Sequence, residues 1–65
     1  MILREAFAFN GNLVRVIYNK GDMGNKYKIR IKKPEFECFQ FVTSFPTMGE
    51  AYRYFDLLVT GGAEA

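Results

Sequence analysis

The sequence has no histidine, only one cysteine and no long hydrophobic run. Without histidine, neither a Ser-His-Asp triad nor a Cys-His pair can form. One cysteine without histidine cannot supply a structural zinc site. Cys38 has no second cysteine for an internal disulfide, which is typical of a reducing compartment, so we expect a cytoplasmic protein. No apolar run approaches the ~20 residues of a membrane-spanning helix, so we expect no membrane association.

Cofactor and targeting motifs are missing as well. The glycines are not spaced as in a P-loop or a dinucleotide-binding fingerprint, and no acidic run matches a calcium loop. Glu35 and Glu37 would share one face of a strand, where two carboxylates could act as acid and base. Solvated carboxylates at the end of a hairpin are the simpler explanation of this pair. Arg4 and Glu5 follow the first three residues at once, so we expect no secretory signal. The sequence therefore predicts a protein without enzymatic activity, cofactor or metal.

The chain is short but rich in aromatic residues. Its 65 residues are 49% hydrophobic and include seven Phe and four Tyr. A chain of this length buries only about 60% of its surface on folding, so large rings contribute much of its stability. Disordered chains lack such apolar content. We expect one domain over residues 1–60 and a flexible tail over residues 61–65.

Residues 5–9 and 13–18 are predicted to form two antiparallel strands. Asn10-Gly11 between them is a strong hairpin signal, because a type I′ turn needs two residues at positive φ. A two-residue turn would place Phe7 opposite Val14 and would put Phe7 and Phe9 on one face. The second strand would then add Val14, Val16 and Tyr18 to the phenylalanine face and Leu13, Arg15 and Ile17 to the other.

The next strand follows a polar loop over residues 19–26 and has the clearest alternation in the chain. This pattern predicts a half-buried strand whose outer face is entirely basic. Pro34 ends it, because proline cannot donate to the strand ladder. The apolar face would hold Tyr27, Ile29 and Ile31, and the basic face Lys28, Arg30 and Lys32.

Residues 36–45 are apolar enough to require a central place in the sheet or a partner. A three-residue loop over residues 33–35 would bury Phe39 and Phe41 and leave Cys38 and Gln40 outside. A two- or four-residue loop would instead expose both phenylalanines among the basic side chains, where they could stack on bases. We expect the first register, because it buries more aromatic surface, at roughly 2 kcal/mol per ring.

The last element is predicted to be a helix. Thr47 and Glu50 form a capping box, and Gly61-Gly62 ends the helix. Leu57 falls on the outer face of this helix and Tyr54 at its border. We therefore expect an α+β fold, a four-stranded antiparallel sheet (ββββα) with one C-terminal helix packed across one face. The apolar stripe of the helix would comprise Met48, Ala51, Tyr52, Phe55, Leu58 and Val59.

Part of the C-terminal half resembles a pattern in small sheet-plus-helix DNA-binding domains. Phe41 and Thr43 stand in the strand, and residues 47–54 read T-x-x-E-A-x-x-Y at the start of the helix. The arm-binding domains of some phage integrases are similar. The resemblance implies a sheet-plus-helix fold and DNA binding. The Trp and dense Arg that such families carry on their strands are absent here.

Charge is distributed unevenly along the chain. Residues 1–33 hold eight basic and two acidic side chains, whereas residues 34–65 hold one basic and five acidic ones. A basic stripe on an uncovered sheet face is typical of phosphate binding, and sheets do enter DNA grooves. The first hypothesis is therefore nucleic-acid binding, most simply of DNA. Its predicted site residues are Arg15, Lys26, Lys28, Arg30, Lys32 and Lys33.

Two alternatives remain open. Ordinary solvation explains basic residues on a strand, which also protect a sheet from edge pairing. The other alternative is a protein-interaction module, a small regulator or inhibitor of the mobile-element or phage type that acts as a homodimer on a protein partner. One helix cannot cover both sides of a sheet, and association would cover the rest. The predicted interface residues are Leu13, Ile17, Val42, Tyr54 and Leu57.

Overall fold

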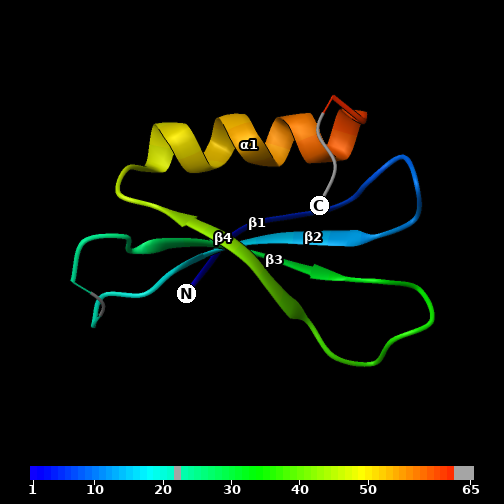
Figure 1. The fold of residues 1–65 in the computed structure, drawn as a ribbon, viewed down its shortest axis with the longest axis horizontal. Coiled ribbons are helices and arrows are strands. Elements are labelled where there is room, and N and C mark those ends of the chain that lie inside the picture. The colour runs from blue at the N-terminus through cyan, green and yellow to red at the C-terminus, as the bar shows by residue number, and fades with distance from the viewer. Residues whose placement is uncertain (22, 63–65) are drawn as a thin grey trace.

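The computed structural model describes residues 1–21 and 23–62, which form one antiparallel sheet and one helix (Figure 1). The strands β1 (Ile2–Phe7), β2 (Leu13–Tyr18), β3 (Tyr27–Lys32) and β4 (Gln40–Phe45) lie side by side in sequence order. Helix α1 (Met48–Thr60) lies along one side of the sheet and packs against β2, β3 and β4. The predicted ββββα architecture is confirmed. Most of the predicted tail, residues 63–65, lies outside the described residues.

The core lies between α1 and the two central strands. Val14, Val16 and Ile29 are fully buried, and each contributes roughly 1.5–3 kcal/mol of hydrophobic stabilisation. These positions confirm the predicted apolar faces of β2 and β3, because the alternation of a strand sends every second side chain to the same side. The other buried hydrophobic residues are Ala8, Ile31, Ala51, Phe55 and Leu58.

Both predicted ends of α1 are confirmed. The hydroxyl of Thr47 accepts a hydrogen bond from the backbone N–H of Glu50 at 3.4 Å. Gly61 ends the helix at φ 90°, a conformation that favours glycine because it has no Cβ. The predicted apolar stripe is wrong at its first residue, Met48, which is 47% exposed. Met48 stands at the start of α1, before the helix crosses the core.

The register of the first hairpin differs from the prediction by one residue. The N–H of Ala8 donates to the carbonyl of Asn12 at 2.7 Å, and Gly11 N–H donates to the carbonyl of Ala8 at 3.0 Å. The loop therefore has three residues, and Gly11, at φ 88°, occupies its left-handed position. A shift of one residue reverses the faces of a strand. Phe7 consequently pairs with Leu13, and Ala6 and Ala8 face α1 in place of Phe7 and Phe9.

The second hairpin also departs from the predicted register. After the turn in which Phe36 N–H donates to the carbonyl of Lys33, the chain continues to Gln40 before it pairs with β3. Phe41 then lies opposite Arg30, on the side away from α1, so the prediction that Phe41 is buried is wrong. A register shift beyond this pair turns Val42 toward the core, which contradicts its predicted place on the solvent face.

Candidate nucleic-acid interface

The side of the sheet opposite α1, here called the open face, is organised in three rows of side chains across the strands. The strand register aligns Glu5, Arg15, Arg30 and Phe41 in the middle row. Phe7, Leu13 and Lys32 form the row on one side of it. Ile2, Ile17, Lys28 and Ser44 form the row on the other side.

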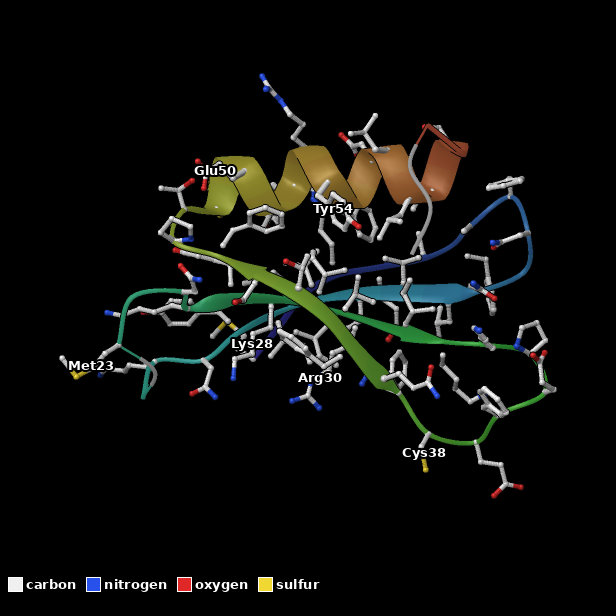
Figure 2. All side chains as sticks on the ribbon, in the orientation of Figure 1. Met23, Lys28, Arg30, Cys38, Glu50 and Tyr54 are labelled. Carbon is white, nitrogen blue, oxygen red and sulfur yellow. The ribbon has the colours of Figure 1, made fainter. Side chains whose placement is uncertain are left out.

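The positive charge of the open face is concentrated on β3. Lys28, Arg30 and Lys32 alternate along this strand, which places neighbouring cations about 7 Å apart. Figure 2 shows Lys28 and Arg30 on the side of the sheet away from α1. The three residues form a line of cations that can follow a chain of phosphates.

Arg15 on β2 is the most constrained cation of the open face. Its Nε and Nη2 atoms lie 2.7 and 2.6 Å from Oε2 of Glu5. Its Cζ atom also lies 3.9 Å from the ring centroid of Phe39. Phe39 is thus half-buried beside a basic residue, and the prediction that it packs in the core is wrong. These contacts make Arg15 a support for the aromatic ring, with much of its charge offset by Glu5.

Arg30 lies at the centre of the open face. It is directly opposite Arg15 on β2, and like charges facing each other across strands are unfavourable. Its Nε atom is buried and has no hydrogen-bond partner among the described residues. The ion pair of Arg15 with Glu5 offsets part of this repulsion.

Phe41 is the exposed aromatic residue at the edge of this positive region. It is 59% exposed and pairs with Arg30 across β3 and β4. It also lines a pocket of about 340 Å³, a volume at the lower end of the range for ligand pockets. The same pocket presents the polar side chains of Asn12, Lys33 and Gln40. This edge therefore combines a free ring with hydrogen-bonding groups.

The structure does not bring all six predicted nucleic-acid-binding residues together. Arg15, Lys28, Arg30 and Lys32 share the open face. Lys26 stands before β3 and Lys33 after it, so they flank the open face at opposite ends. Lys33 lies near Phe36, with Nζ 5.9 Å from the ring centroid.

The five predicted protein-interface residues do not form one surface. Leu13 and Ile17 lie half-buried on the open face. Val42 and Tyr54 pack against the core instead, and the Tyr54 ring lies 5.5 Å from that of Phe45. Tyr54 is half-buried, in agreement with its predicted place at the border of the outer helix face, and Phe45 packs against it. Leu57 is exposed on the helix, as its position in the sequence predicts.

Sequence reasoning missed three contributors to the open face. Glu5, Phe7 and Phe41 all depend on a register that the strand patterns alone do not determine. The alternative prediction for the second hairpin, a two- or four-residue loop, places Phe41 on the exposed side, where the structure has it. Ala6 and Ala8 could have indicated which side of β1 faces the helix, because small residues allow a helix to approach a sheet closely.

No helix among residues 1–21 and 23–62 is long and apolar enough to cross a membrane. Within the same residues, no group of three or more His, Cys, Asp or Glu side chains is placed to hold a metal ion. Comparisons with protein-family models, curated proteins and solved structures find no significant match to this chain.

Proposed function

We propose that this protein is a non-enzymatic nucleic-acid-binding module that binds DNA through its open face. The observation that carries the proposal is the line of cations on β3 beside the exposed ring of Phe41. Cations neutralise phosphates, and an exposed ring offers a surface to bases. Within residues 1–21 and 23–62 no helix covers this side, so a ligand can approach the three cations from one direction.

The charge balance of the open face supports the same proposal. Among the described residues, four cations face a single carboxylate, Glu5, which is engaged by Arg15. The net charge of the whole chain is only +2, so the positive potential is local. Such a local potential favours a small footprint of a few phosphates over broad nonspecific coating.

Fluorescence anisotropy of labelled DNA across a range of salt concentrations tests the proposal. We expect log K to fall linearly with log salt. Three or four phosphate contacts give a slope of about −2 to −3 for single strands at roughly −0.7 per contact. Absence of binding even at low salt would contradict the proposed function.

A second candidate function is a protein-interaction module that acts as a homodimer. Phe7 is 72% exposed and Ile2 is 52% exposed, and both lie on β1, which pairs on one side only. A strand edge beside exposed apolar side chains is a site for pairing with another chain. Light scattering at high micromolar concentration tests this candidate, and a monomer under those conditions would exclude the homodimer.

A further inference from the structure

Resting on the proposed function, we propose that the open face binds single-stranded DNA in preference to duplex DNA. The phosphates follow the cations of β3, and an unpaired base stacks on Phe41 at the edge of the sheet.

The exposure of Phe41 is the first step toward this inference. A large ring that is 59% exposed leaves much of its hydrophobic stabilisation unrealised in the free protein. A base that stacks on the ring recovers it, and such stacking does not depend on sequence because every base has a π face. In a duplex the bases are already stacked on each other, so the ring has no partner.

The geometry around Phe41 gives the base its surroundings. Arg30 lies directly across from Phe41 and can contact the phosphate next to the stacked base. The pocket that Phe41 also lines holds Gln40, which pairs with Ile31 and so lies on the α1 side of the sheet, away from Arg30. On the open face itself, a cation and an exposed ring therefore lie side by side.

A second aromatic residue, Phe39, lies beside Arg15 and adds to the aromatic surface of the open face. The guanidinium of Arg15 lies over the Phe39 ring, with Cζ 3.9 Å from its centroid, and donates a hydrogen bond to Glu5. The ring and the guanidinium are held in place before any ligand binds, so less side-chain entropy is lost on binding. This ordered pair extends the stacking surface from the edge toward the middle of the sheet.

We propose DNA as the ligand in place of RNA because the open face has few uncharged polar side chains. Proteins distinguish RNA through hydrogen bonds to its 2′-hydroxyl. Among the described residues that the register places on this face, Ser44 is the only uncharged hydrogen-bonding side chain. Glu5, the one carboxylate that the register of the described strands places on this face, is already engaged by Arg15. The face thus offers cations and rings but little that would favour a ribose.

A competition between labelled oligomers tests the inference. Fluorescence anisotropy would measure a short oligo-dT, a DNA duplex of the same length and an oligo-rU of the same length. We expect oligo-dT to bind about tenfold more tightly than the duplex and at least as tightly as oligo-rU. Duplex binding that equals or exceeds oligo-dT binding would overturn the inference, and tighter binding of oligo-rU would overturn the assignment to DNA.

Variants of Phe41 test the stacking contact itself. We expect Phe41→Ala to weaken oligo-dT binding about tenfold and Phe41→Tyr to retain it within about twofold. Phe9→Ala, which removes an exposed ring from the first hairpin loop, is the matched control and should leave affinity within about twofold. Circular dichroism would verify that each variant folds. The oligomer competition uses the unaltered protein, so it tests the inference even if a variant does not fold.

The outcomes separate the inference from the function on which it rests. If Phe41→Ala binds oligo-dT as the unaltered protein does while salt still weakens the complex, the stacking contact is wrong and nucleic-acid binding stands. If neither single strand nor duplex binds at low salt, the inference and the proposed function both fail.

Discussion

Both faces of the sheet carry hydrophobic side chains, but they use them differently. On the face under α1, Val14, Val16 and Ile29 are fully buried. On the open face, Phe7 and Phe41 remain mostly exposed among charged side chains. The first arrangement maximises hydrophobic stabilisation, whereas the second leaves aromatic rings exposed beside cations. The comparison teaches that substitutions on the two faces should affect different measurements.

The largest effect on stability should come from the core. Ile29→Ala removes buried methyl groups and leaves a cavity, so we expect a loss of about 2–5 kcal/mol in the free energy of unfolding. A domain of this size rarely has more than about 3–5 kcal/mol, so this variant should be largely unfolded. Urea denaturation would measure the loss, with Ile29→Val as a milder variant at about 0.5–1.5 kcal/mol.

Ile17→Ala on the open face is the matched control, and we expect it to cost less than half as much as Ile29→Ala, because Ile17 is only partly buried. Equal losses at the two positions would show that the open face is stabilised as the core is.

A second effect on stability comes from the end of α1. Gly61 has φ 90°, and an added Cβ would lie 3.0 Å from Cε1 of Phe9. We therefore expect Gly61→Ala to cost about 1–2 kcal/mol in the free energy of unfolding. Gly49→Ala is the matched control within the helix, because nothing lies within 4 Å of an added Cβ there. It should stabilise by up to about 1 kcal/mol, and thermal denaturation of both variants would measure the contrast.

The smallest effect should come from Glu5, the carboxylate of the open face. Glu5→Gln removes the partner of Arg15, which is a partly exposed ion pair, so stability should fall by no more than about 1 kcal/mol. The same change raises the positive charge of the face, so we expect DNA binding to tighten by about two- to fivefold at low salt. Weaker binding would mean that Glu5 serves the site chiefly by holding Arg15 and Phe39.

The fold could be predicted from sequence because its signals are local. The alternation along β2 and β3 distinguishes their two sides, and the cap at Thr47 with Gly61 marks both ends of the helix. These signals involve residues that are close in sequence. They require no knowledge of how one strand is placed against the next.

The candidate site could be predicted only in part because it depends on register. A three-residue loop with Gly11 in the left-handed region, in place of a two-residue turn, moves Phe7 to the open face. The longer connection before Gln40 and the irregularity beside Arg30 do the same for Phe41 and turn Val42 inward. The preference for maximal burial predicted the wrong side for Phe39 and Phe41, and the assumed two-residue turn predicted the wrong side for Phe7. Such local departures are expected where a protein keeps a surface for function.

The most direct test of the central claim is a charge reversal on the open face against an equal reversal elsewhere. One double variant combines Lys28→Glu with Arg30→Glu, and the other combines Lys20→Glu with Arg53→Glu at exposed positions off this face. Both change the net charge by the same amount, and anisotropy with labelled DNA would compare them at equal salt.

We predict that the open-face pair abolishes binding while its circular dichroism spectrum stays unchanged, and that the other pair weakens binding by less than about tenfold. Equal losses in the two variants would contradict a binding site on the open face.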